Sequence, residues 1–69
     1  MTAPLDRLRK TTGRLERHDA ERARIMAERD AQIAAALAGG ATWSQVQEAS
    51  GLNPSAVRKA LERHRAAQP

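Results

Sequence analysis

The chain has 69 residues, 12 basic and 8 acidic side chains, a formal net charge of +4 and no cysteine. A chain of this length forms at most one domain with a small core, which usually needs a disulfide, a metal or a partner subunit for support. Disulfides are excluded by the lack of cysteine, and the two histidines, His18 and His64, are too few and too far apart in sequence for a zinc site. We therefore expect a homodimer, and we expect no cofactor.

The chain also lacks the features of a membrane or secreted protein. No apolar run approaches the roughly 20 residues of a membrane span, and no signal peptide is visible. Zero cysteines fit a reducing compartment, so we expect a soluble cytoplasmic protein. The positive balance favours a polyanionic partner, although it also keeps a small protein soluble. Ten of the 12 basic residues are arginine, which binds phosphates and guanine edges well, but a GC-rich genome explains that usage equally well.

The composition predicts an all-α fold. Alanine is abundant, β-branched residues are few, and Phe and Tyr do not occur. Pro4 suits the first turn of a helix, and Asp6 favours the same helix end. From there to Ala38 only Gly13 opposes a helix, at a cost of about 1 kcal/mol relative to alanine. The sequence leaves open whether this segment is one helix or breaks near residues 11–14.

Residues 1–28 are predicted to form an N-terminal helical arm. Leu5, Leu8 and Leu15 form a sparse apolar stripe, and a strict heptad fails because Arg22 and Arg29 occupy two of its positions. Ion pairs three or four residues apart support the helix. We expect three of them: Arg17–Glu21, Glu21–Arg24 and Arg24–Glu28. Two interpretations stay open, a solvated arm and a dimer-forming helix, and we assign the arm to dimerisation because exposed leucines need cover.

Residues 29–69 carry the signals of a compact helical unit. Gly39 and Gly40 predict the end of the long helix. Thr42 predicts the cap of a short helix over residues 43–50, with Gln45 completing a capping box. After Gly51, a third helix is predicted to open at Pro54 behind an Asn53 cap. We predict that large apolar residues form the core of this C-terminal half: Leu37, Trp43, Val46, Leu52, Val57 and Leu61.

Residues 43–62, WSQVQEASGLNPSAVRKALE, resemble the helix-turn-helix of phage repressor and Cro-like regulators and of the trihelical homeodomain-like family. Val46 stands at the inner position of the first helix, Gly51 in the turn and Leu52 directly after it. The inner stripe of the second helix is matched by three residues: Val57, Ala60 and Leu61. The chain departs from the family at two positions, because Gln47 stands where alanine is usual and Ser50 where a large apolar residue is usual. Small actinobacterial DNA-binding and nucleoid-associated proteins are similar in size, composition and architecture.

The resemblance implies that the third helix enters the major groove of double-stranded DNA. Arg58 and Lys59 are then expected to bind guanine edges or phosphates, and Ala56 to meet a thymine methyl. The start of the short helix faces the phosphate backbone. The expected DNA contacts are Thr42, Ser44, Gln45, Asn53, Ser55, Ala56, Arg58, Lys59 and Arg63. Plainer interpretations remain: Asn53 as a cap only, and Arg58 and Lys59 as a solvated face.

The sequence offers no clear set of catalytic residues, since no nucleophile has a neighbouring histidine and no glycine-rich phosphate loop occurs. We expect a non-enzymatic DNA-binding protein of the nucleoid, with no small-molecule ligand, that acts as a transcription regulator or a nucleoid-associated protein on short palindromic sites. The alternative is a helical protein–protein interaction module that docks on an acidic partner. An RNA binder is disfavoured because the sequence has only one aromatic residue for base stacking.

Overall fold

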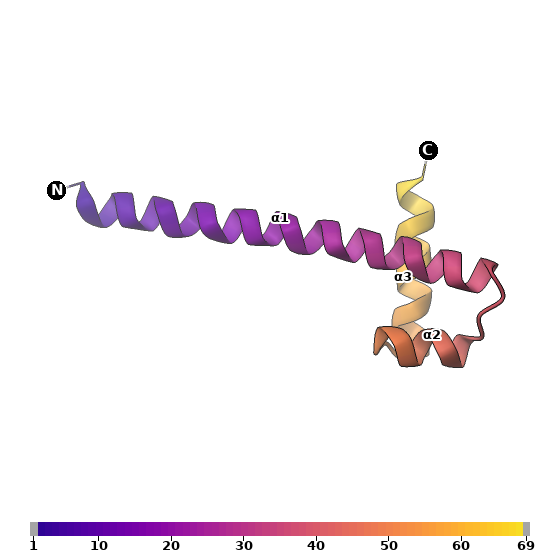
Figure 1. The fold of residues 1–69 in the computed structure, drawn as a ribbon. Helices are drawn as coiled ribbons and strands as arrows, with labels where there is room; N and C mark the ends of the chain where they lie inside the picture. Colours follow the sequence, from indigo (N-terminus) through magenta and orange to yellow (C-terminus); the bar gives the residue numbers. More distant parts are fainter. Residues whose placement is uncertain (1, 69) are drawn as a thin grey trace.

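The computed structural model describes residues 2–68 and consists of three helices. They are α1 (Ala3–Ala38), α2 (Trp43–Ser50) and α3 (Pro54–Ala67), and residues 2–68 contain no strand. The prediction of an all-α fold is confirmed. As Figure 1 shows, α1 is a long rod whose C-terminal end alone meets α2 and α3. No helix within residues 2–68 is long and apolar enough to cross a membrane.

Helix α1 runs through Gly13 without a break. One glycine costs about 1 kcal/mol, and the neighbouring turns of a 36-residue helix hold it in place. Of the three expected ion pairs, Glu21–Arg24 forms at 2.6 Å; the other two are not found within residues 2–68, whereas Asp6 and Arg9 pair at 3.1 Å. The expected domain boundary at residue 28 therefore falls inside a continuous helix.

Burial divides the molecule into two parts. Residues 2–25 are all exposed except Gly13, which is half-buried, and Met26 is the first half-buried side chain of the packed region. We call residues 3–25 the arm and residues 26–68 the head. The chain measures 60 × 28 × 17 Å, with a radius of gyration of 17.5 Å. A compact chain of this length has about 11 Å, so the arm makes the molecule strongly elongated.

The core of the head is small. Ile33 from α1, Val46 from α2, and Val57 and Ala60 from α3 are buried together. Partly buried apolar residues surround this cluster: Leu37, Ala41, Leu52 and Leu61. Five of the six predicted core residues therefore lie in or against the core, while Ile33 and Ala60 were not in that prediction.

The prediction for Trp43 is wrong, because its side chain is 42% exposed. Trp43 is the first residue of α2 and does not belong to the apolar residues that pack against the core cluster. Ala41, two residues earlier in the link between α1 and α2, packs against the cluster instead. The indole at the end of a two-turn helix therefore lies outside the core.

Candidate nucleic-acid interface

The start of α2 is closed by the predicted capping box. Gln45 N–H donates to Thr42 Oγ1 at 3.1 Å, and Thr42 N–H donates to Gln45 Oε1 at 2.9 Å. Both side chains are thus used to hold the helix end, and they remain exposed together with Ser44. The N–H of Ser44 has no helical acceptor, as is normal for a first-turn residue, and points out of the helix end.

The turn between α2 and α3 is built by three consecutive residues. Gly51 ends α2 in the left-handed conformation, with φ of 71°, and its N–H donates to Gln47 O at 2.9 Å. A side chain at this φ would be strained, so glycine is required here. Leu52 N–H donates to Ser50 Oγ at 3.2 Å, which gives the polar side chain of Ser50 a role in the turn.

Helix α3 begins as the sequence predicts. Asn53 Oδ1 accepts a hydrogen bond from Ala56 N–H at 2.8 Å, and Pro54 occupies the first turn. Val57 and Ala60 are fully buried against the other helices. Because a helix turns about 100° per residue, burial of these two residues determines which positions of α3 face outward.

Four side chains share the outward face of α3. Arg58 and Lys59 are exposed, and both lie three or four residues from Ser55 and Glu62, which are exposed as well. Glu62 is not among the residues expected to contact DNA. Its spacing of seven residues from Ser55 places it on the same side of α3, and this spacing could have predicted its position. Ala56 is half-buried, so its methyl group offers less surface to a ligand than the neighbouring side chains.

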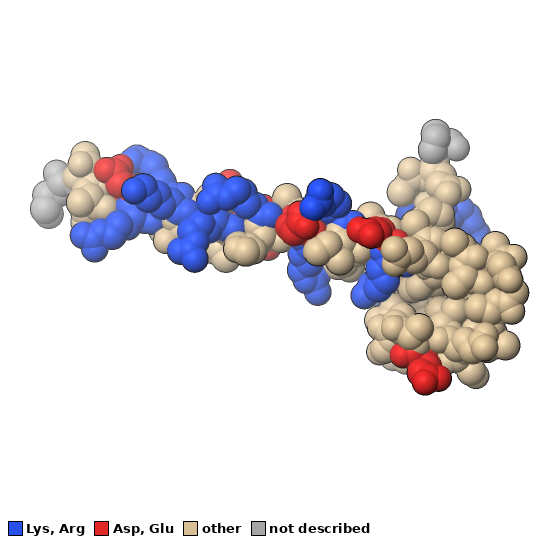
Figure 2. All heavy atoms as spheres, in the orientation of Figure 1, with Lys and Arg blue, Asp and Glu red and all other residues tan. Residues whose placement is uncertain are grey.

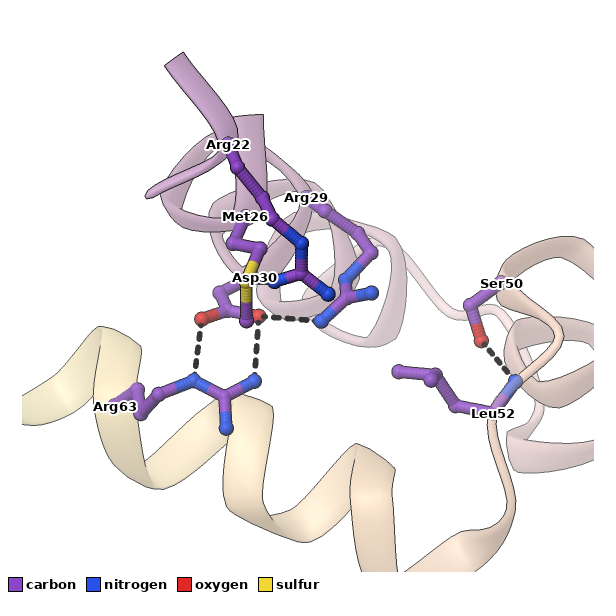
Figure 3. A network of polar contacts seen from close by, with 7 residues as sticks. All are labelled: Arg22, Met26, Arg29, Asp30, Ser50, Leu52 and Arg63. Atoms are coloured by element: carbon purple, nitrogen blue, oxygen red, sulfur yellow. Dashed lines mark hydrogen bonds and ion pairs between the residues drawn. The ribbon is translucent and has the colours of Figure 1, made fainter. Parts of the chain in front are cut away.

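The structure gives Arg63 a partner within the chain. Its Nε lies 2.9 Å from Asp30 Oδ2 and its Nη2 lies 3.1 Å from Asp30 Oδ1, so α3 and α1 are joined by a two-pronged ion pair (Figure 3). The Asp30 side chain is 5% exposed, and the Arg63 side chain is 46% exposed. This pair connects residues 33 positions apart, and no sequence pattern within one helix could have revealed it.

Charge keeps Asp30 ionised. The hydrogen bond from Arg63 lowers the pKa of Asp30 below its ordinary value, against burial, which raises it; the charges of Arg63 and Arg29 lower it further. The same hydrogen bond raises the pKa of Arg63. Arg29 Nη2 lies 3.7 Å from Asp30 Oδ1, so this one buried carboxylate interacts with two guanidinium groups, one from α1 and one from α3.

The nine expected DNA-contacting residues fall into three groups in space. Thr42, Ser44 and Gln45 are exposed at the start of α2. Five residues belong to the first two turns of α3 or its cap: Asn53, Ser55, Ala56, Arg58 and Lys59. Arg63 stands apart from both groups, because it is held against Asp30.

Basic residues are more numerous on the arm than on the head. The arm carries seven of the 12 cations, and Figure 2 shows them spread along its length, while the visible face of the head is mostly uncharged. Helix α3 contributes four cations and one acidic residue. A polyanion therefore has two basic surfaces available, one along the arm and one on α3.

Comparisons with known proteins do not extend this picture. No family model, curated protein or solved structure matches the chain.

Proposed function

We propose that the chain binds double-stranded DNA through the outward face of α3 and acts as a homodimer, as a transcription regulator or a nucleoid-associated protein in the cytoplasm. The observation that carries the proposal is the arrangement from Thr42 to Lys59: two capped helices joined at a left-handed glycine, with Arg58 and Lys59 exposed opposite the buried Val57 and Ala60. A helix held in this way presents a rigid polar face, which a major groove accepts.

The residues of this face have complementary roles in such a complex. Arg58 suits a two-pronged bond to guanine O6 and N7, and Lys59 suits a phosphate. Glu62, one turn later, suits the amino group of cytosine and repels phosphate, so it favours base contact at that position. Asn53 and Ser55 lie at the start of α3, the end that approaches base edges in helix-turn-helix complexes.

Thr42, Ser44 and Gln45 serve the phosphate backbone in this proposal. The first turn of α2 carries the positive end of the helix dipole and N–H groups that an oxygen of phosphate accepts. Such contacts set the position of the protein on the duplex without reading its sequence. We assign Arg63 a different role from the one expected, namely holding α3 on α1, because two of its nitrogens already bind Asp30.

The experiment is duplex binding by the Arg58→Ala/Lys59→Ala double variant at two salt concentrations. We expect affinity for the preferred duplex to fall by more than about tenfold, since a good base pair contact alone contributes about 1–3 kcal/mol. Lys59→Ala alone should reduce the salt dependence by about one unit of slope. Arg14→Ala/Arg17→Ala removes the same charge from the arm and serves as the matched control.

Two outcomes contradict the proposal. One is a double variant, folded by circular dichroism, that binds its duplex as tightly as the parent. The other is an equal loss in the arm control, which would make binding a matter of net charge. The first result would favour the interaction of the head with an acidic protein instead.

A further inference from the structure

A row of basic residues runs along one side of the arm. Arg7, Lys10, Arg14 and Arg17 follow one another at spacings of three, four and three residues, which places them on one side of a helix. All four residues are exposed. Because a helix rises about 1.5 Å per residue, the row is about 15 Å long. We call these four residues the basic stripe.

The basic stripe carries charge that the chain does not neutralise. In the part of the chain that the structure describes, none of its four side chains forms an ion pair. The acidic residues at its two ends are used by other arginines, because Asp6 pairs with Arg9 at 3.1 Å and Glu21 pairs with Arg24 at 2.6 Å. Glu16, the only acidic residue within the stripe, is turned about 100° around the helix from the cation that follows it.

The basic stripe faces away from the head. Asp30 and Ile33 mark the side of α1 that α3 covers, because both contact residues of α3. At about 100° per residue, the centre of the basic stripe lies about 150° around α1 from these two residues. Leu8 and Leu15 lie instead on the side that α3 covers. A ligand on the basic stripe therefore meets neither these leucines nor α3.

Helix α3 presents its own cations in the other direction. Val57 and Ala60 are buried in the core together with Ile33 of α1, so Arg58 and Lys59 point away from α1. Figure 1 shows α3 crossing the C-terminal end of α1, with the arm extending beyond the head. The two basic surfaces thus lie on opposite sides of α1, and one straight duplex cannot cover both.

We propose that the basic stripe binds the phosphate backbone of double-stranded DNA, on a segment other than the one at α3. Over about 15 Å of its axis, one strand of a duplex presents about four phosphates, which equals the number of cations in the stripe. Three of these cations are arginines, whose guanidinium binds a phosphate with two parallel hydrogen bonds. Binding of two duplex segments by one chain rests on the proposed function, whereas binding of a duplex by the arm does not.

A lipid surface fits the arm less well than DNA does. A helix that lies in a membrane surface binds through a large apolar side, and its affinity scales with the apolar area that it buries. The apolar side of the arm carries few large residues, and two charged residues interrupt it, because Asp19 and Arg22 follow Leu15 by four and seven residues. A row of phosphates needs no apolar contact.

The salt dependence of DNA binding tests the basic stripe. The probe is a short random-sequence duplex, and the background is the full chain with Arg58→Ala/Lys59→Ala, which leaves the arm as the main basic surface. In this background, Arg14→Ala/Arg17→Ala should reduce the slope of log K against log salt by about two units, since each phosphate contact contributes about 0.9. Alanine favours a helix, so circular dichroism should show the helix content unchanged or higher.

Arg9→Ala/Arg22→Ala is the matched control in the same background. It removes the same charge from the same helix, but from side chains that have partners: Arg9 pairs with Asp6, and Arg22 Nη1 donates to Met26 Sδ at 3.1 Å (Figure 3). Both arginines lie about 100–120° around the helix from the centre of the basic stripe. We expect this control to change the slope by less than about half a unit.

A pull-down measures whether one chain holds two duplex segments. Beads that carry a random-sequence duplex should retain a second, free and labelled copy of it when the parent protein is present. Arg14→Ala/Arg17→Ala, made in the otherwise unchanged chain, should reduce this retention by more than about fivefold, because half of the phosphate contacts of the stripe are lost. A homodimer that joined duplexes through its two α3 helices would not need the stripe, so unchanged retention overturns the two-segment arrangement.

The proposal is overturned if Arg14→Ala/Arg17→Ala leaves the slope unchanged, or if Arg9→Ala/Arg22→Ala lowers it equally. It is also overturned if Arg14→Ala/Arg17→Ala abolishes binding to vesicles of anionic phospholipid without changing the slope, which assigns the stripe to a membrane. Failure of the proposed function gives a different result: Arg58→Ala/Lys59→Ala then binds the duplex as tightly as the parent, while the arm substitutions still reduce the slope.

Discussion

The arm and the head use the same helix in opposite ways. In the head, the apolar side of α1 is covered by α2 and α3, and Ile33 is 5% exposed. In the arm, the same side carries leucines that are more than half exposed. The arm therefore depends on helix propensity and local ion pairs, whereas the head depends on tertiary packing. One continuous helix can contain two segments with different sources of stability.

This difference predicts how the two parts respond to mutation. A change in the head acts on packing between helices, so it should alter cooperative unfolding of the whole three-helix unit. A change in the arm acts on one helix and its neighbours, so it should alter helix content at the N-terminal end. Three substitution experiments separate these two behaviours.

The largest effect is expected from Val57→Ala. Val57 is fully buried at the centre of the core, and removing its two methyl groups should cost about 2 kcal/mol from lost burial and the cavity left behind. A small domain has little stability to spare. Trp43→Ala, although it removes a much larger side chain, should cost about 1 kcal/mol or less because the indole is 42% exposed. Urea unfolding measures both, and a larger loss from Trp43→Ala would contradict the core described above.

The next effect is expected from Asp30→Asn, which breaks the pair between α1 and α3. Its amide leaves Arg63 without a buried negative partner, so the melting temperature should fall at neutral pH. Glu21→Gln, which removes an ion pair on the exposed arm, should change it little.

The effect of Asp30→Asn should depend on pH in a defined direction. The folded-state pKa of Asp30 lies below the ordinary value of 3.8, so the stabilisation is complete above 3.8 and is lost as the pH falls through the lowered pKa. Melting curves of the parent and of Asp30→Asn should therefore converge in strong acid. A gap that stays constant down to pH 2 would show that the carboxylate charge is not the cause.

The smallest effects are expected from two glycines, with opposite signs. Gly51→Ala should destabilise the head by about 1 kcal/mol, because φ of 71° disfavours a side chain. Gly13→Ala should raise the helix content of the arm, because alanine favours a helix by about 1 kcal/mol relative to glycine. A Cβ at this position meets only Arg17 Nη1 at 3.5 Å, so the methyl group fits without strain. Circular dichroism at 222 nm during thermal unfolding distinguishes the two variants. If both substitutions raised the thermal stability, or both lowered it, the division into arm and head would be contradicted.

Much of the head could be predicted because its local signals act within a few residues. Thr42 with Gln45 caps the start of α2, Gly51 ends it, and Asn53 caps the start of α3. Pro54 occupies the first turn of α3, and all of these features were expected. The exposed positions of Arg58 and Lys59 follow from the burial of Val57 and Ala60 by helical geometry. Whether these exposed residues bind DNA stays a prediction.

The sequence by itself determined the helical class, both ends of α2 and the start of α3, because these depend on the backbone and on neighbours three or four residues away. Tertiary structure alone decided that α1 passes unbroken through Gly13, that Ala41 rather than Trp43 meets the core, and that Arg63 turns inward to Asp30. These outcomes depend on which surfaces meet across long stretches of chain. The buried carboxylate of Asp30 pairs with the cation that the packing of α3 on α1 brings within reach, which is Arg63. The spacing of residues along the sequence does not determine which cation that is.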